Sequence, residues 1–324
     1  MSALLEAVGL SHAYRAGRRT VPVLHAIDLA IAEGRSLGLV GESGCGKSTL
    51  ARCLLRLVDP TGGRVVYRGR DLLRLSAREL RPLRRELQLV FQDPGASFDP
   101  RLTLAESLRE PLRVHHLEEE RSRRRAQLER LIEPVGLRAE LLERFPHELS
   151  VGQLQRAAVA RALALSPRLL VADEPTSALD VSLSAQLLNL LADLRRDRGL
   201  TYLFITHQLP LVEAICEEVA VLYFGRIVER LSTSELGRRA LHPYTQALLQ
   251  ASPRLPGRTS AGGDLPSPRV RLEGEPASPL APPPGCSFHP RCPLYRARGA
   301  VRCTAESPTL RTIGAEHEVA CHEV

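Results

Sequence analysis

The stretch from residue 41 to residue 49 constrains this chain more than any other. It reads Gly41-Glu42-Ser43-Gly44-Cys45-Gly46-Lys47-Ser48-Thr49 and fits the phosphate-loop pattern G-x-x-x-x-G-K-[ST] at every defined position. Lys47 is the only lysine in a chain with 44 lysine and arginine residues in all. A compact ammonium reaches the β- and γ-phosphates of a nucleotide, whereas a planar guanidinium is too bulky for a tight phosphate cradle. The sequence therefore predicts a site for a nucleoside triphosphate.

The residues on either side of the loop support this prediction. Residues 35–40 form a short apolar run suited to a buried strand, and residues 48–58 repeat leucine at helical spacing. In a strand, loop and helix unit of this kind, glycines let backbone N–H groups turn toward phosphate oxygens, and the helix N-terminus adds a favourable dipole. An ordinary glycine-rich turn with a chance lysine would lack these flanks.

The bulk composition bounds the class of protein. A length of 324 residues suits about two domains, and a hydrophobic content of 44% is ample for a core. No apolar run approaches the ~18 residues needed to cross a bilayer, and the N-terminus lacks a basic stretch leading into an apolar segment. We therefore expect a soluble, cytosolic chain.

The net charge of +7 is spread along the chain. The densest charged run, residues 118–125, mixes both signs, and its spacing allows i,i+4 pairs between Glu119 and Arg123 and between Glu120 and Arg124. A nucleic-acid patch would carry basic residues without such acidic partners. We expect a solvated helix face and no nucleic-acid partner.

The order of apolar segments predicts an α/β fold. Antiparallel strands are expected within residues 4–31, ahead of the loop, and a helical, charge-rich region at about residues 100–148. Further expected elements are strands at 86–92, 168–173 and 201–206, helices at 150–166, 181–198 and 209–217, and a hairpin at 219–231 around Gly225. Alternating strands and helices favour a mostly parallel sheet covered on both faces.

Polar residues follow several of these segments. Residues 169–174 form an apolar strand that delivers Asp173 and Glu174 to its C-terminal end, where ligands bind in α/β sheets. One carboxylate can hold Mg²⁺ through water and the next can polarise an attacking water; a helix-capping pair is the alternative. Ser150 starts a helix in Leu149-Ser150-Val151-Gly152-Gln153, a second anion-binding N-terminus. His207 ends an apolar strand, either as a γ-phosphate sensor or as an ordinary strand-end histidine.

Together with Gln92 and the segment Ser177-Ala178-Leu179-Asp180, these motifs resemble those of the ATP-binding-cassette (ABC) ATPases over about residues 4–250. The resemblance implies an α/β fold of the P-loop NTPase ABC cassette type, with a mostly parallel core sheet, an N-terminal antiparallel β-subdomain and an inserted helical subdomain at about residues 95–165. Residues 1–250 would be the ATP-binding domain and residues 251–324 an irregular, cysteine-containing C-terminal extension.

The resemblance also implies roles for individual residues. The residues that bind ATP would be Tyr14, Gly41, Glu42, Ser43, Gly44, Cys45, Gly46, Lys47, Ser48, Thr49, Gln92, Ser150, Gly152, Gln153, Asp173 and Asp180. Tyr14 would stack on adenine, and Mg²⁺ would be organised by Ser48, Gln92 and Asp173. The catalytic residues would be Glu174, His207 and Gln92. Ser150, Gly152 and Gln153 would contact the γ-phosphate held by the opposite subunit, so that two cassettes close face to face around two ATP molecules.

One residue departs from the family pattern. The usual signature is L-S-G-G-Q, and here Val151 stands at the first glycine. Valine is acceptable in the first turn of a helix, but it narrows the approach of a partner's nucleotide. We therefore expect the composite site that uses this signature to be weakened.

Residues 91–101 and the tail narrow the resemblance further. The tail carries His242-Pro243-Tyr244-Thr245-Gln246-Ala247-Leu248-Leu249 and Pro284-Gly285-Cys286-Ser287-Phe288-His289-Pro290-Arg291-Cys292-Pro293. These segments resemble the ATPase subunits of bacterial oligopeptide/dipeptide importers. The implied partners are a second ABC ATPase subunit (a paralogue or an identical chain), two integral-membrane permease subunits and an extracytoplasmic substrate-binding protein, at the cytoplasmic face of the bacterial cytoplasmic membrane.

Two kinds of alternative stay open. The chain could serve another ABC transporter, either a nickel or metal-chelate importer or an exporter, although an exporter subunit would lack the peptide-importer tail. A soluble ABC protein that acts on nucleic acid or ribosomes would need long coiled-coil insertions or a second cassette, and the sequence has neither.

Four of the seven cysteines lie close to the end of the chain: Cys286, Cys292, Cys303 and Cys321. A cytosolic protein seldom uses such a group for disulfides. Four thiolates can bind Zn²⁺ or a [4Fe–4S] cluster, and the wide spacing favours the iron–sulfur cluster over zinc. Free thiols are the alternative.

Overall fold

The computed structural model describes residues 3–17, 19–252, 274, 277–278, 280–314 and 316–324. The chain divides into two compact units. The first unit comprises residues 1–32, 36–73 and 206–324, and the second unit comprises residues 33–35 and 74–205. Within the described ranges, no helix combines the length and the apolar character that a membrane crossing requires.

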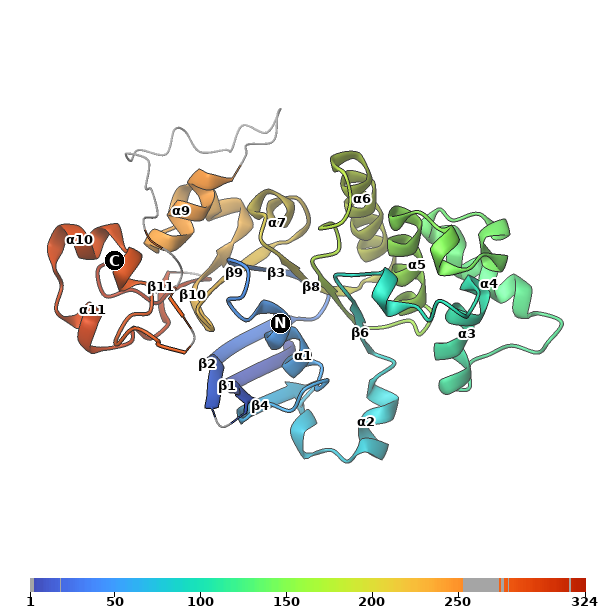
Figure 1. Cartoon of the computed structure of the whole chain (residues 1–324), viewed down its shortest axis with the longest axis horizontal. Helices are drawn as coiled ribbons and strands as arrows, with labels where there is room; N and C mark the ends of the chain where they lie inside the picture. The colour runs from blue at the N-terminus through green and yellow to red at the C-terminus, as the bar shows by residue number, and fades with distance from the viewer. Residues whose placement is uncertain (1–2, 18, 253–273, 275–276, 279, 315) are drawn as a thin grey trace. The chain divides into compact units, whose positions relative to one another are not determined.

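The first unit begins with an antiparallel sheet, drawn in blue in Figure 1. Strands β1 (Ala3–Ala16) and β2 (Arg19–Ala32) pair along most of their length, and β4 (Gly62–Tyr67) and β5 (Arg70–Asp71) complete the order β2-β1-β4-β5. Leucines and isoleucines at alternate positions of β2 are buried, whereas their neighbours are more exposed. This sheet confirms the antiparallel strands expected ahead of the phosphate loop.

The first unit also contains five strands of a second sheet, and the phosphate loop follows the C-terminal end of one of them. Strand β3 (Ser36–Val40) is buried at all five positions and runs parallel to β9 (Glu218–Tyr223). Antiparallel pairing then continues through β10 (Arg226–Ser232) and β12 (His317–Val319) to β11 (Arg311–Gly314). The expectation of a mostly parallel sheet is therefore too simple: the two hairpins make the sheet mixed.

Short helices surround these strands. They are α1 (Lys47–Leu54), α7 (Leu209–Ile215), α8 (Leu236–Arg239), α9 (Pro243–Ala251), α10 (Pro293–Arg298) and α11 (Arg302–Ala305). Helix α1 stops before the expected residue 58, because Arg56 takes a left-handed φ of 48°.

The C-terminal extension has more regular structure than expected. Helices α10 and α11 and the hairpin β11–β12 gather around the C-terminus in the red part of the chain (Figure 1). The expectation of an irregular extension is therefore wrong for residues 293–319. Most of the Pro-, Gly- and Ser-rich stretch at 252–284 lies outside the described residues.

A buried carboxylate fastens the extension to the rest of the first unit. Glu229 of β10 is fully buried and accepts hydrogen bonds from the backbone N–H of Leu241 (2.7 Å) and of His242 (3.2 Å). Its Oε1 also lies 2.9 Å from Nε2 of His317 in β12. A buried carboxylate is stable only when it is well hydrogen-bonded, so Glu229 fixes the start of α9 and strand β12 together.

The second unit contains parallel strands and longer helices. Its strands pair in the order β6 (Leu87–Val90), β7 (Leu169–Asp173) and β8 (Thr201–Thr206). The last residue of β8, Thr206, is counted with the first unit. The α-helices of the second unit are α2 (Ala77–Leu83), α3 (Leu104–Val114), α4 (Arg124–Ile132), α5 (Val151–Leu163) and α6 (Val181–Arg198). Seven 3-10 turns complete the described secondary structure of the chain: Leu72–Arg74, Gly95–Ser97, Glu133–Val135, Ala139–Glu143, Pro146–Glu148, Thr233–Glu235 and His289–Arg291.

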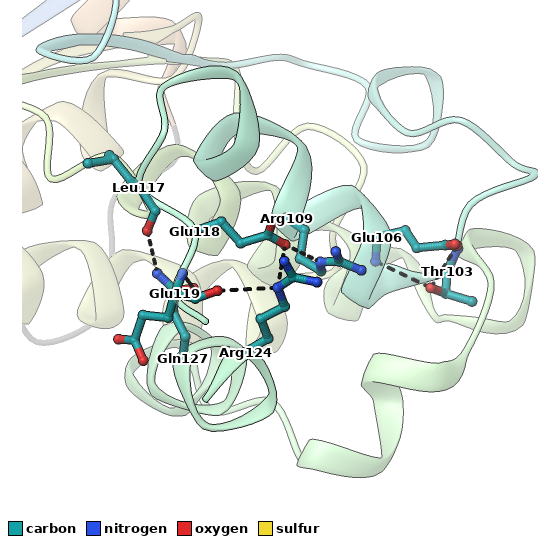
Figure 2. Close-up of polar contacts among 8 residues, drawn as sticks. All are labelled: Thr103, Glu106, Arg109, Leu117, Glu118, Glu119, Arg124 and Gln127. Atoms are coloured by element: carbon teal, nitrogen blue, oxygen red, sulfur yellow. Dashed lines mark hydrogen bonds and ion pairs between the residues drawn. The ribbon is translucent and has the colours of Figure 1, made fainter. Parts of the chain in front are cut away.

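Ion pairs in the helical region differ from the expected ones. Figure 2 shows Glu118 between the guanidinium groups of Arg109 and Arg124, at 2.6 Å and 3.4 Å. The side chain of Gln127 donates to Leu117 O and accepts from the N–H of Glu119. Helix α4 begins only at Arg124, so residues 118–123 are not helical and the expected Glu119–Arg123 and Glu120–Arg124 pairs are wrong. Glu119 instead pairs with Arg130.

The turn between β9 and β10 generates a stability prediction. Gly225 has a left-handed φ of 70°, and a Cβ at this position would lie 2.0 Å from Val23 O. We expect Gly225→Ala to destabilise the protein by about 2–4 kcal/mol, from the left-handed backbone and the clash together. Gly199 is the matched control, because it has a φ of 62° with nothing within 4 Å; Gly199→Ala should cost only about 1 kcal/mol. Urea unfolding of both variants measures the difference, and equal losses would contradict the prediction.

Candidate functional site

The phosphate loop connects a buried strand to a helix in the first unit. Strand β3 ends at Val40, and α1 begins at Lys47. Gly44 and Gly46 have left-handed φ values of 80° and 108°, a conformation that residues with a Cβ rarely adopt. Left-handed residues in such a turn direct N–H groups toward a common anion. The loop therefore has the backbone of a phosphate cradle.

Lys47 lies inside this loop. Its side chain is 5% exposed, and Nζ donates hydrogen bonds to Gly41 O (2.8 Å) and Glu42 O (2.9 Å). These carbonyls hold the ammonium at the start of the loop, so a phosphate there would meet a cation that is already positioned. Burial of a full positive charge is costly unless hydrogen bonds or an anion compensate it, and an anionic ligand would add that compensation.

Tyr14 lies beside the end of the same loop. Its Oη is 3.4 Å from Oγ1 of Thr49, and its ring meets the imidazole of His12 edge-on at a centroid distance of 4.5 Å. The tyrosine is 39% exposed. An exposed aromatic ring next to a phosphate loop offers a stacking surface for a base. His207, the other expected residue of this unit, is exposed directly after β8.

The second unit brings two of the expected catalytic residues together. Asp173 is buried at the end of β7, and Nε2 of Gln92 lies 3.4 Å from Oε2 of Glu174. Glu174 has a left-handed φ of 44°, and its N–H donates to Ile205 O at 2.9 Å. A non-glycine residue in this conformation is strained by about 1–3 kcal/mol, and such residues cluster at functional sites. The strain singles out Glu174 among the carboxylates of this unit.

Other expected residues of the second unit form helix caps. Ser150 caps α5: its Oγ accepts from the N–H of Gln153 (3.2 Å), whose Oε1 accepts from the N–H of Ser150 (2.9 Å). Asp180 caps α6 by accepting from the N–H of Leu183 at 2.8 Å. Because Asp173 belongs to β7 and Asp180 is the cap, the helix-capping alternative for Asp173 and Glu174 is wrong.

Two residues of the signature segment differ in the space around them. Val151 is 47% exposed at the first turn of α5, so its side chain costs the fold little. At Gly152, an added Cβ would lie 3.3 Å from Leu183, which leaves little room for a side chain. The weakening expected from Val151 stays a prediction.

The sequence alone missed two residues that contact the phosphate loop. The Oη of Tyr244 accepts a hydrogen bond from the N–H of Glu42 at 2.8 Å. The guanidinium of Arg291 donates to both carboxylate oxygens of Glu42, at 2.9 Å and 3.0 Å. These partners lie 202 and 249 residues away in the chain, so no local pattern could reveal them.

The four tail cysteines are neighbours in the structure. The N–H of Cys286 donates to Cys303 O at 2.9 Å, and all seven cysteines of the chain are free thiols. Burial, with smaller contributions from Cys303, Cys321 and Cys292, raises the pKa of Cys286 to about 11. Within the described ranges, however, no three or more His, Cys, Asp or Glu side chains are arranged so that they could hold a metal ion. These cysteine side chains therefore do not form the ligand group that was expected.

Two regions of the chain match known families. Residues 24–177 match the family described as ABC transporter, and residues 228–298 match the one described as oligopeptide/dipeptide transporter, C-terminal region. The "Probable peptide ABC transporter ATP-binding protein y4tS" of Sinorhizobium fredii is 47% identical over 308 residues, which are 94% of this chain and 84% of that protein. The oligopeptide transport ATP-binding protein AppF of Bacillus subtilis is 43% identical over 303 residues, which are 93% and 89% of the two chains.

Solved structures agree with the fold. A dimeric structure of the ATP-binding cassette MJ0796, in a post-hydrolysis state bound to ADP and Pi, superposes with a TM-score of 0.65 at 29% identity and covers 71% of this chain and 98% of that one. The structure of cbiO1 from Clostridium perfringens, part of the ABC transporter complex cbiONQ, gives a TM-score of 0.64 at 24% identity. The second likeness concerns the fold alone.

The burial of Lys47 generates a prediction about its chemistry. Lys47→Arg keeps the positive charge, but it places a larger planar group in a position that is 5% exposed. We expect the variant to bind ATP about 100-fold more weakly, because guanidinium and ammonium are not interchangeable in a tight site. Isothermal titration with ATP measures this. Arg52→Lys, an exposed position of the same helix, should bind as the wild type does; a Lys47→Arg variant with unchanged affinity would contradict the argument.

Proposed function

The chain belongs to the ATP-binding subunits of ABC transporters, in the oligopeptide/dipeptide group, and from this premise we propose that it hydrolyses ATP to power import of oligopeptides or dipeptides across the bacterial cytoplasmic membrane. The single observation that carries the proposal is the combination, in one chain, of a cassette region and a peptide-transporter C-terminal region. A cassette alone would be compatible with many transporters; the second region narrows the class to peptides.

The residues of the first unit would bind the nucleotide. Tyr14 would stack on adenine, while Lys47 and the backbone of residues 41–49 would hold the phosphates. The hydrogen bonds of Lys47 to two carbonyls keep its ammonium ready for this role. His207 would contact the γ-phosphate.

The residues of the second unit would carry the chemistry. Glu174 would orient and deprotonate the attacking water as a general base, and Gln92, 3.4 Å from it, would orient both the water and the carboxylate. Mg²⁺ would be organised by Ser48, Gln92 and Asp173, whose hydroxyl, amide and carboxylate oxygens are ligands of the kind that it prefers. Mg²⁺, when bound, neutralises the charge that develops on the phosphate oxygens.

We further propose a division of labour between subunits. Two cassettes would close around two ATP molecules, with Ser150, Gly152, Gln153 and Asp180 of one contributing to the site of the other. ATP binding would close the pair and hydrolysis would reopen it, a conformational cycle that does mechanical work on two permease subunits. An extracytoplasmic binding protein would deliver the peptide, and the chain would act at the cytoplasmic face of the membrane.

We also propose the domain limits. Residues 1–250 would be the ATP-binding domain, with its helical subdomain at about residues 95–165, and residues 251–324 the extension. The ligand itself would be selected by the permeases and the binding protein, because ATP chemistry carries no information about a peptide.

The role of Glu174 is directly testable. Glu174→Gln keeps the shape of the side chain but removes the base, so we expect ATP binding to persist while hydrolysis falls ~100-fold or more. The ATP-loaded variant should accumulate as a closed dimer in size-exclusion chromatography. Glu140→Gln, whose side chain is 78% exposed in the same unit, is the control and should turn over normally. Near-normal turnover of Glu174→Gln would remove Glu174 from the catalytic role.

We propose, finally, that the tail cysteines bind an inorganic centre, with a [4Fe–4S] cluster favoured over Zn²⁺. Four thiols are a suitable donor set by type, and Cys303, Cys321 and Cys292 are near enough to Cys286 to act on it electrostatically. Within the described residues they do not form a group arranged to hold a metal ion. Burial raises the pKa of Cys286 to about 11, so its thiol is costly to ionise at neutral pH. A bound metal would offset this free-energy cost because thiolates are its ligands.

Anaerobic purification tests the tail proposal. An iron–sulfur cluster would give absorbance near ~400 nm together with iron and sulfide, because thiolate-ligated clusters absorb there and Zn²⁺ does not. A colourless preparation with stoichiometric zinc would overturn the cluster in favour of zinc. A preparation free of metal would overturn both metal assignments.

A further inference from the structure

A carboxylate stands inside the phosphate loop, and the C-terminal extension neutralises it. Glu42 is the second residue of the loop, and its two carboxylate oxygens accept hydrogen bonds from the two terminal nitrogens of Arg291 at 2.9 Å and 3.0 Å. The Arg291 side chain is 8% exposed and that of Glu42 is 25% exposed. This is the bidentate geometry in which guanidinium and carboxylate interact most strongly.

The position of Arg291 is fixed from several sides. It ends the 3-10 turn His289–Arg291, and the preceding Phe288 is buried against the rings of Tyr223 and Tyr244, with centroid distances of 5.1 Å and 5.5 Å. The guanidinium carbon also lies 6.0 Å from the ring centroid of Tyr223. Aromatic packing of this kind holds the extension against the loop, so Arg291 is delivered to Glu42 by a rigid support.

The main chain of Glu42 serves the loop directly. Its carbonyl accepts a hydrogen bond from Nζ of Lys47, and its N–H donates to Tyr244. Glu42 is thus bound by Arg291 through its side chain and by Lys47 through its carbonyl. A shift of Glu42 would therefore move a partner of Lys47.

Charge gives the contact a second consequence. A nucleoside triphosphate is strongly anionic, and a free carboxylate in its binding loop would repel it, the more so in a partly buried site where water screens charge poorly. A guanidinium bound to both oxygens cancels most of that repulsion. Without its counter-ion, Glu42 would oppose the ligand that the loop binds.

We propose that Arg291 of the C-terminal extension is a positioning residue and counter-ion of the phosphate loop, so that the extension is required for tight ATP binding. Arg291 acts through Glu42: it neutralises the carboxylate and holds the segment that carries a carbonyl partner of Lys47. This inference rests on the proposed function, since it concerns the ATP affinity of the same loop.

The test compares ATP affinity among variants of the full-length chain by isothermal titration with Mg²⁺ and ATP. Arg291→Gln leaves the carboxylate uncompensated, and we expect ATP to bind ~10-fold more weakly. The double variant Glu42→Gln/Arg291→Gln removes the uncompensated charge, and its affinity should return to within ~3-fold of the wild type. The loss in Arg291→Gln should also shrink at high salt relative to the wild type, because salt screens charge repulsion.

Controls separate this role from a general effect on folding. Arg302→Gln removes another arginine of the extension, 69% exposed and paired with Glu306, and should bind ATP as the wild type does. The thermal midpoint of each variant reports its folding. If Arg291→Gln is unfolded, Arg291→Lys replaces it. Lysine keeps the positive charge but cannot hold both carboxylate oxygens, so this variant should bind ATP ~3-fold more weakly than the wild type and keep a normal kcat. An affinity of Arg291→Lys equal to that of the wild type would contradict the positioning role.

The outcomes separate a failure of the Arg291 role from a failure of the proposed function. ATP binding by the wild type and by Arg291→Gln with equal affinity would overturn this inference alone. A double variant as weak as Arg291→Gln would also overturn it, because a purely structural role of the extension cannot be rescued by removal of a loop carboxylate. A wild-type chain that does not bind ATP would overturn the proposed function, and the inference with it.

Discussion

Lys47 is held inside the first unit by two carbonyl oxygens of its own loop, and the arrangement around it follows from the need to compensate a buried positive charge. One of these carbonyls belongs to Glu42, which is in turn held by Tyr244 through its N–H and by Arg291 through its side chain. The turn at Gly225 supports the far side of the loop, where its N–H donates to Cys45 O at 2.9 Å. Three remote segments thus fix one lysine.

Local signals explain what could be predicted from the sequence. Helix α6 and strand β8 begin and end where expected, because Asp180 caps the helix and Gly199 ends it in a left-handed conformation. The expected Glu119–Arg123 pair is wrong because it assumed that the helix begins earlier. No capping residue in the sequence marks Arg124 as the first residue of α4. The contacts of Tyr244 and Arg291 with the loop depend on tertiary packing, which a pattern of neighbours does not contain.

Glu174, the proposed catalytic base, has a strained backbone. Its left-handed φ of 44° costs free energy that a glycine would not pay, and its backbone is kept there by a hydrogen bond to Ile205 in the adjacent strand. The strands β7 and β8 are buried throughout. The free energy of packing these strands therefore offsets the cost of the strained backbone at Glu174. The apolar runs of both strands could be read from the sequence, whereas the strained backbone could not.

The hairpin β11–β12 has a consequence for the sheet to which it is added. Strand β12 pairs with β10 at Glu229 and Arg230, so it occupies hydrogen-bonding groups of β10 that could otherwise recruit a strand from another molecule. The new outer strand, β11, has only four residues, begins with an exposed arginine and ends in glycine. A strand so short and charged is a poor template for edge-to-edge association. With the extension in place, the sheet therefore ends on this side in a strand that disfavours association through its edge.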